Sequence, residues 1–178
     1  MGIAPDLLLN ADQHLGALVG RYGHWIYALL FVIVLCETGL VVMPFLPGDS
    51  LLFTVGALAA VEVLDLFIAV PLFVTASVLG SNLNYWIARW IGPRAFHFPK
   101  SALFNPAYLQ KAHVFYEKYG AGMMLFVRFV PVVRTFGPFA AGVAAMDYRK
   151  YLIYDSIGAV SWSATVTGLG FWLGNAVF

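Results

Sequence analysis

The chain has 178 residues, of which 61% are hydrophobic and only 11% charged, with a mean hydropathy of +0.82. This composition is too apolar for an ordinary soluble domain and predicts an all-α integral membrane protein. A formal net charge of +1, without a basic stripe of interleaved aromatic residues, gives no basis for a nucleic-acid partner. The single cysteine, Cys36, cannot form an internal disulfide.

Four apolar runs separated by short polar stretches organise residues 1–178 as a single membrane domain. They lie at about 25–61, 66–88, 121–146 and 152–177. The second and fourth runs are each long enough to cross a hydrocarbon layer of roughly 30 Å at about 1.5 Å per residue. The first and third are each interrupted near the middle by proline, glycine and charge. That pattern predicts re-entrant helical hairpins whose tips are buried in protein or line a wet cavity.

An amphipathic segment precedes each hairpin. Residues 7–19 and 106–119 both place apolar side chains at helical spacing, and the second segment follows the N-cap and first-turn pair Asn105-Pro106. Both are predicted to be helices on the membrane surface. The order surface helix, re-entrant hairpin and transmembrane helix therefore occurs twice, in one repeat at about 7–90 and a second at about 106–177.

Basic residues are concentrated in the loops around 89–120 and 147–152, whereas Arg21 is the only Lys or Arg in the opposite set of loops. The positive-inside rule predicts that the basic loops are cytoplasmic. The two repeats would then begin on opposite sides of the membrane and form an inverted repeat. Such a repeat would bring the two hairpin tips together near the midplane, where transporters bind their substrates.

Four ionisable side chains lie in the two hairpin runs as complementary pairs. Glu37 and Asp49 belong to the first run, and Arg128 and Arg134 belong to the second. Charge at membrane depth is costly and usually marks a substrate or ion pathway. If the tips meet, the four formal charges sum to zero in one shared site, as a low-dielectric site prefers. The alternative is a static network of buried charges that holds the hairpins in register.

Half-helices are predicted to begin at both tips. Asp49 or Ser50 can cap one that runs to residue 60, and Thr135 can start one that runs to residue 145. Their N-termini would point at the centre and favour an anion, particularly a phosphate, whose oxygens an arginine can bind at two places. Glu37 or Asp49 would then couple anion passage to protonation.

Other residues are secondary candidates. Asn82 and Tyr85 lie in the first span and either line a pathway or form interhelical hydrogen bonds. Gly170 and Gly174 predict close helix packing, within the chain or between copies in a homo-oligomer. The histidines lack metal-ligand spacing, so neither a metal nor a cofactor is expected. The hairpins are expected to be shaped by prolines and glycines, namely Pro44, Pro47, Gly48, Pro131 and Gly142.

Several motifs carry a resemblance to a known family: Glu37-x-Gly39, the stretch from Pro44 to Ser50, the series Gly80, Tyr85, Arg89 and Gly92, the pair Tyr119-Gly120, the stretch from Arg128 to Thr135, and Ala141-Gly142. Through them the chain resembles the DedA family, also called the SNARE-associated or VTT-domain membrane proteins. The resemblance implies two opposed re-entrant hairpins, residence in the bacterial cytoplasmic membrane, and dependence on protons or membrane potential. It also implies movement of lipid, notably undecaprenyl phosphate, with the acidic pair and the arginine pair as the functional residues. Relatives usually continue into a last apolar helix, whereas this chain ends at Phe178, so it is expected to be truncated or a short member.

The charge pattern and the resemblance together predict a flippase for undecaprenyl phosphate or a related lipid phosphate, with protons or sodium as the coupling ion. A proton-coupled exchanger of small cations or cationic drugs, with the two carboxylates as binding groups, is the alternative. A membrane enzyme acting on lipid phosphates is not expected, because the chain has neither a GxSxG nor an HExxH motif. A structural or assembly role in the membrane is the remaining hypothesis.

Overall fold

The computed structural model describes residues 11–39, 48–95, 120 and 122–177. Within these ranges the regular secondary structure is entirely α-helical, which confirms the predicted all-α class. The helices are α2 (Ala11–Gly39), α3 (Gly48–Ala60), α4 (Leu66–Ala95), α6 (Met123–Val127), α7 (Pro131–Val143) and α8 (Tyr148–Val177).

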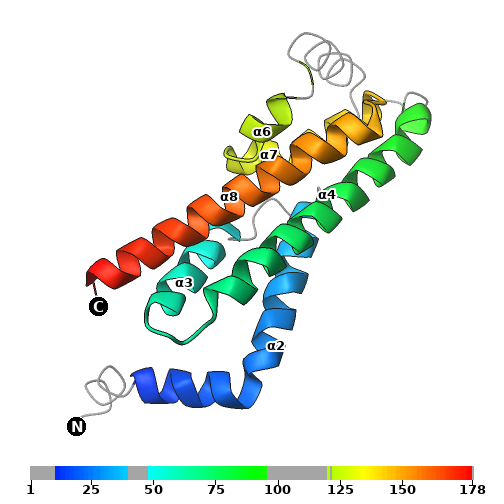
Figure 1. Ribbon diagram of the computed structural model, residues 1–178. Coiled ribbons are helices and arrows are strands. Elements are labelled where there is room, and N and C mark those ends of the chain that lie inside the picture. Colours follow the sequence, from blue (N-terminus) through cyan, green and yellow to red (C-terminus); the bar gives the residue numbers. More distant parts are fainter. Residues whose placement is uncertain (1–10, 40–47, 96–119, 121, 178) are drawn as a thin grey trace.

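The predicted surface helix at 7–19 and the first arm of the predicted first hairpin belong to one continuous helix. Residues 11–39 form the single helix α2, which bends along its length (Figure 1), and residues 7–10 lie outside the described residues. Glycines at 20 and 23 lower helix stability by roughly 1 kcal/mol each, but unlike proline they keep their backbone N–H. The chain therefore changes direction by bending rather than by ending the helix.

The predicted start of the second half-helix at Thr135 is wrong. Helix α7 begins at Pro131, after an extended N-cap at Val130 with φ of −108° and ψ of 107°. Proline suits this first helical position because its φ is already helical and its missing N–H has no partner there. Pro138 consequently lies inside the helix. Like α3, α7 has 13 residues.

Helices α4 and α8, with 30 residues each, form the central pair of long helices, and α2 has 29 residues. The segment Leu66–Ile91 of α4 is, among the described residues, the one helix that is both long and apolar enough to cross a membrane. Helix α8 carries more polar residues, but Asp155, Ser163 and Thr167 are fully buried, whereas Ile157 and Val160 are exposed. Polar groups therefore face the protein interior and apolar groups face outward.

Two predicted loops are partly helical. Helix α4 continues to Ala95 and α8 begins at Tyr148, so the ends of the loops around 89–120 and 147–152 belong to these helices. The predicted surface helix at 106–119 lies outside the described residues. The boundary differs from the hydropathy pattern because the polar residues at the ends of a long helix, such as Arg149 and Lys150, can be exposed without interrupting its backbone hydrogen bonds.

Helices α4 and α8 lie side by side in opposite directions, and the shorter helices pack around them (Figure 1). Helix α3 packs along α8, while α2 and α7 pack along α4. Gly170 and Gly174 serve the contact between α8 and α3, because a Cβ at Gly170 would lie 2.9 Å from the carbonyl carbon of Phe53 and one at Gly174 would lie 3.0 Å from Cα of Ala57. This glycine pair is therefore used within the chain.

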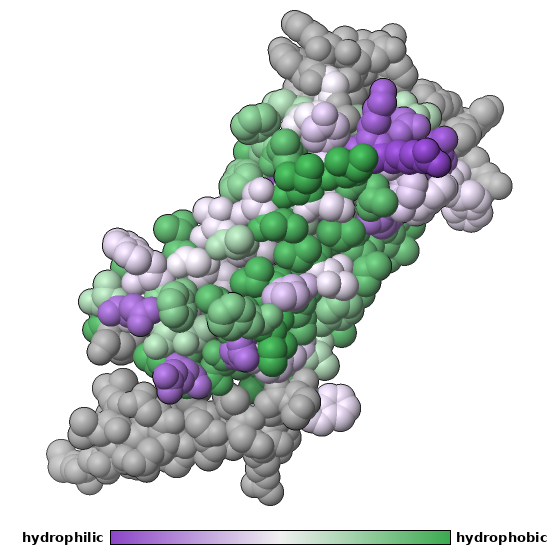
Figure 2. Space-filling view, viewed as in Figure 1, coloured by the Kyte–Doolittle hydropathy of each residue, from purple (hydrophilic) through white to green (hydrophobic). Residues whose placement is uncertain are grey.

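The surface has the polarity expected at a membrane. Figure 2 shows hydrophobic residues over the middle of the visible face and hydrophilic residues gathered toward its two ends. Large apolar side chains are exposed on both long helices, including Phe67 at 89% and Trp172 at 68%. Exposed aromatic and aliphatic side chains on this scale are unfavourable in water and favourable against lipid.

Candidate functional site

Arg134 joins elements from both predicted hairpins. It lies at the start of α7 and donates hydrogen bonds to Glu37 on α2 and, over 2.6 Å, to Asp49 on α3. Glu37 and Arg134 are buried, at 3% and 8% exposure, whereas the Asp49 side chain is 39% exposed. When all three groups are ionised, two carboxylates and one guanidinium leave a formal charge of −1. We call these three residues the Arg134 cluster.

Trp162 covers the Arg134 cluster from α8. The guanidinium carbon of Arg134 lies 4.6 Å from the centroid of the indole ring, in range of a cation–π interaction. The indole N–H donates a 2.9 Å hydrogen bond to the same Asp49 oxygen that accepts from Arg134. Trp162 is only 3% exposed, so it orients both charged groups and shields them from one side.

Asn84 on α4 fixes the backbone beside the cluster. Its side-chain N–H₂ group donates to the carbonyl of Thr38 over 3.3 Å and to the carbonyl of Thr135 over 2.9 Å. These two residues directly follow Glu37 and Arg134 in the chain. One amide therefore holds the ends of both elements in register, and the predicted candidate Thr135 contributes through its backbone rather than as the start of a helix.

Gly48 allows the two arms of the first hairpin to approach at this point. A Cβ built on Gly48 would lie 2.6 Å from the carboxyl carbon of Glu37, well inside van der Waals contact. Glu37 therefore occupies the space that any other residue at position 48 would fill. Gly48 therefore lets α3 start close to α2, and the hairpin-shaping role predicted for it stays a prediction.

Arg128 lies in a second cluster instead of joining the first. It follows α6 directly and donates to Asp155 on α8 over 2.6 Å, and also to the hydroxyls of Ser77 and Ser81 on α4. Asp155 is fully buried and Arg128 is 5% exposed. Gly158 makes room for this arginine, since a Cβ there would lie 3.0 Å from its Cδ. The side chains form a neutral pair, the Arg128 cluster.

The structure therefore distributes the predicted charges over two clusters, which corrects the expectation of one shared site with zero net charge. Asp155 of the Arg128 cluster and Trp162, which covers the Arg134 cluster, are seven residues apart on α8, or about 10 Å along the helix axis. Arg134, Glu37 and Asp49 are in direct contact, whereas Arg128 pairs with a fifth charged residue. The part that any of these side chains takes in substrate binding stays a prediction.

Sequence reasoning missed Asp155 although a signal for it was present. It is the only acidic residue in the apolar run 152–177, and an ionisable side chain at membrane depth calls for a partner. Ser77, Ser81 and Trp162 carried no comparable signal, because serine and tryptophan are common in membrane helices.

The remaining polar candidates lie outside both clusters. Asn82 donates to the carbonyl of Val78 over 2.7 Å and accepts a 2.9 Å hydrogen bond from the hydroxyl of Tyr148. Tyr85 donates to the carbonyl of Met146 over 2.6 Å and is fully buried. Both therefore connect α4 to the start of α8, as interhelical hydrogen bonds would. Ser50 lines a cavity between α2 and α3.

The remaining shaping residues act through packing. A Cβ on Gly142 would lie 2.8 Å from Cβ of Ala88, so this glycine lets α7 pack closely on α4. Pro131 begins α7, whereas Pro44 and Pro47 lie outside the described residues. In the part of the chain that the structure describes, no group of three or more His, Cys, Asp or Glu residues is arranged to hold a metal ion.

Together these features define a class: a helical membrane protein in which two short helices meet at a buried ion-pair cluster between two long helices. The chain matches the VTT domain over residues 46–171. It is 49% identical over 172 residues to protein DedA of Escherichia coli strain K12, an alignment that covers 96% of this chain and 78% of that protein. The chain belongs to the DedA family of VTT-domain membrane proteins.

Two further relatives extend the comparison. An uncharacterized membrane protein of Mycobacterium tuberculosis strain H37Rv is 42% identical over 176 residues, covering 98% of this chain and 76% of the relative. Inner membrane protein YghB of Escherichia coli strain K12 is 31% identical over 173 residues, covering 97% and 76%. No solved structure matches the chain significantly. The family predicted from the sequence motifs is confirmed.

Proposed function

We propose that this protein is a transporter that carries undecaprenyl phosphate or a related lipid phosphate across the bacterial inner membrane. The observation that carries the proposal is the contact of Arg134 with Glu37 and Asp49, which links α2, α3 and α7 through charged side chains. Buried ionisable groups in a membrane protein are costly and usually serve transport. An arginine fork is suited to phosphate oxygens. Membership of a family whose relatives include a named inner membrane protein supports the location.

The lengths of the short helices support a re-entrant, inverted arrangement. Helices α3 and α7 have 13 residues each, about 20 Å, which is less than a hydrocarbon layer of roughly 30 Å. Their N-terminal ends meet through Asp49 and Arg134. We therefore propose that each helix begins near the midplane and runs outward to its own side of the membrane. The loops around 89–120 and 147–152 would then lie on the cytoplasmic side.

Charge balance indicates how transport would be coupled to protons. In the Arg134 cluster, Asp49 already occupies the first turn of α3, where the helix dipole favours an anion. A lipid phosphate that binds Arg134 competes with Glu37 and Asp49 for the same guanidinium. Adding the phosphate to a cluster that already carries a charge of −1 brings like charges together, and proton uptake by a displaced carboxylate offsets that repulsion. Each binding event would thus exchange an internal ion pair for a phosphate and a proton.

The two arginines have different roles in this proposal. Arg134 reaches the partly exposed Asp49 and is the head-group ligand, whereas Arg128 is enclosed by α4 and α8 with Asp155, Ser77 and Ser81 as partners. Arg128 therefore supports transport by anchoring α6 to the long helices.

Proteoliposomes test this function directly. Purified protein is reconstituted in vesicles with labelled undecaprenyl phosphate, and its movement between leaflets is followed with an imposed pH gradient. The parent protein is expected to accelerate movement, and Arg134→Ala is expected to abolish the effect. Arg149→Ala, which removes an exposed arginine at the start of α8, is the matched control. Transport that survives the loss of Arg134 contradicts the proposal.

One observation favours the second candidate, a proton-coupled exchanger of small cations or cationic drugs. The Arg134 cluster is negative overall and lies against the indole ring of Trp162, and both features attract cations. Arg134 itself occupies that face, so an external cation would have to displace it. A pH jump that drives a small cation across protein-containing vesicles free of lipid phosphate, with loss of the flux in Glu37→Gln, would support this candidate over the lipid.

A further inference from the structure

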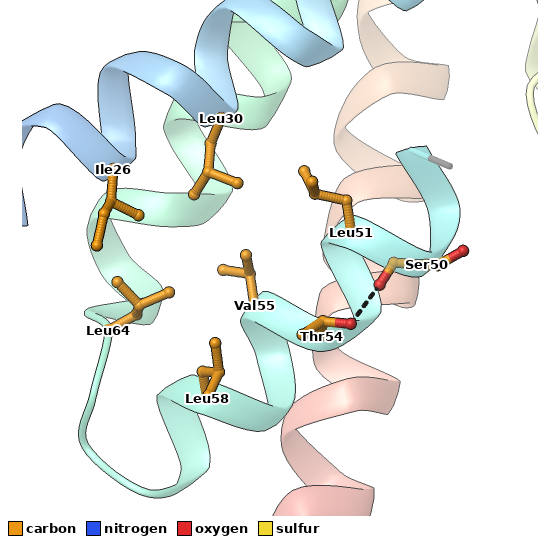
Figure 3. A pocket seen from close by; sticks show the side chains of 8 residues that line it. All are labelled: Ile26, Leu30, Ser50, Leu51, Thr54, Val55, Leu58 and Leu64. Carbon is orange, nitrogen blue, oxygen red and sulfur yellow. Dashed lines mark hydrogen bonds between the residues drawn. The ribbon is translucent and has the colours of Figure 1, made fainter. Parts of the chain in front are cut away.

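A cavity of about 350 Å³ lies between the two arms of the first hairpin. Figure 3 shows Ile26 and Leu30 of α2 facing Val55 and Leu58 of α3 across it. The arms are in closest approach at the tip, where Gly48 lies against Glu37. Away from the tip they separate, and the cavity occupies the resulting wedge.

The lining is apolar along almost its whole length. The hydroxyl residues Ser50 and Thr54 lie toward the N-terminal end of the helix, beside Asp49 of the Arg134 cluster, whereas Val55 and Leu58 lie further along (Figure 3). From residue 50 to residue 58 the wall is about 12 Å long. The cavity therefore begins next in sequence to Asp49 of a charged cluster and is aliphatic along its length.

Water is a poor occupant of this space. A buried water needs two to four polar partners, and the lining offers almost no polar surface. None of the eight lining residues is charged. The Thr54 hydroxyl already donates a 2.7 Å hydrogen bond to the carbonyl of Ser50. An apolar chain fits the lining better than a hydrated or charged ligand.

We propose that this cavity binds the first part of the hydrocarbon chain of a lipid phosphate whose head group lies at Arg134. This inference rests on the function proposed above and adds a chain-binding site to it. Ser50, at one end of the cavity, directly follows Asp49, the carboxylate that competes for Arg134, so a lipid with its phosphate at the cluster has its chain at the entrance. The remainder of a long chain leaves the cavity for the bilayer.

Substitutions that fill the cavity test the inference. Thr54 is exposed and outside the hydrophobic core, so Thr54→Trp fills the space without replacing a core residue. Ile26→Trp fills the space from α2, where the side chain is partly buried and packs against the edge of the hydrophobic core. The matched control is Leu29→Trp, which adds the same ring to an outward position of α2 that is 61% exposed and does not line the cavity. Thermal unfolding in detergent verifies that all three variants fold.

The measurement is binding of undecaprenyl phosphate and of inorganic phosphate to each variant, together with cross-linking by a lipid phosphate that carries a diazirine near its head group. Thr54→Trp and Ile26→Trp are expected to weaken binding of the long-chain phosphate at least tenfold and to leave binding of inorganic phosphate unchanged. The Leu29→Trp control is expected to bind both phosphates as the parent protein does. Cross-links are expected on residues 26–30 and 50–58. If binding depends on Arg134 but is unchanged in both cavity-filling variants, the chain-binding site is wrong and the proposed function stands. If the parent protein binds no lipid phosphate, both the chain-binding site and the proposed function are wrong.

Discussion

Asp155 accepts a 2.6 Å hydrogen bond from Arg128 in the interior of the molecule, and the two form an ion pair with side-chain exposures of 0% and 5%. Arg128 also donates to Ser77 and Ser81. The pair thus connects the end of α6 to both long helices. Buried ion pairs add little net stability relative to apolar packing, but the loss of one partner leaves an uncompensated charge.

This asymmetry predicts the effect of mutating Asp155. Asp155→Asn is expected to lower the free energy of unfolding by about 3–5 kcal/mol, because Arg128 then stays buried without a counter-charge. The double variant Arg128→Met with Asp155→Leu is expected to recover most of that loss, since both charges are replaced by apolar groups. Denaturant unfolding in detergent micelles measures all of these values.

Glu62→Gln provides the control for charge removal. Glu62 is an exposed carboxylate in the turn after α3, and its neutralisation is expected to change stability by no more than about 0.5 kcal/mol. A double variant that is less stable than Asp155→Asn alone would show that the pair contributes more than mutual neutralisation and would contradict this account.

The sequence was sufficient to predict the type of most elements, because the signals for them are local. Hydropathy over 66–88 identified α4, and the break after residue 60 identified the end of α3. The first residue of each helix was harder to predict. Thr135 and Pro131 are both suitable first-turn residues. A proline disfavours the helical conformation at the residue before it, so Val130 is extended and α7 begins at Pro131.

The pairing of charges could not be predicted in the same way. Arg128 and Arg134 are only six residues apart, and nothing local indicates that they face different partners. The selection is made by close helix contacts. Gly158 makes room for the Arg128 side chain, and Gly48 makes room for Glu37. Which glycine faces which side chain is a property of the packed helices, so the single predicted site became two clusters.

Neutralising both carboxylates of the Arg134 cluster should separate anion binding from proton coupling. In the double variant Glu37→Gln with Asp49→Asn, the formal charge of the cluster changes from −1 to +1 because two negative charges are lost. The dissociation constant for undecaprenyl phosphate is expected to fall about tenfold, equivalent to about 1.4 kcal/mol. Transport is expected to lose its response to a pH gradient. Equilibrium binding and proteoliposome flux give the two readouts.

Each single substitution serves as an intermediate for that double variant, with a cluster charge of zero. Lipid phosphate affinity is expected to rise in the order parent, single variants, double variant. If affinity for the phosphate is unchanged and affinity for a small organic cation is lost, the carboxylates bind cargo directly, and the cation exchanger becomes the better description.

Gly48→Ala should impair function more than its small size suggests. The new Cβ would lie 2.6 Å from the carboxyl carbon of Glu37, so the carboxylate must move from its position against Arg134. Transport is expected to fall at least tenfold, with a stability loss of about 1–3 kcal/mol. Gly168→Ala on α8 is the matched control, because a Cβ there meets no heavy atom within 4 Å. That change is expected to be neutral or to stabilise α8 by up to about 1 kcal/mol. Normal transport by Gly48→Ala would show that the contact between position 48 and Glu37 is dispensable.

Gly170→Ala distinguishes packing within the chain from association between copies. A Cβ at this position would lie 2.9 Å from the backbone carbonyl carbon of Phe53, and backbone atoms cannot move aside as a flexible side chain can. Helices α8 and α3 must therefore separate, and the free energy of unfolding is expected to fall by about 1–3 kcal/mol. The molar mass of the purified protein in detergent, measured by light scattering, is expected to stay the same as that of the parent. A change in molar mass without a loss of stability would instead place Gly170 at an interface between copies, because the contact with α3 would then tolerate the added methyl group.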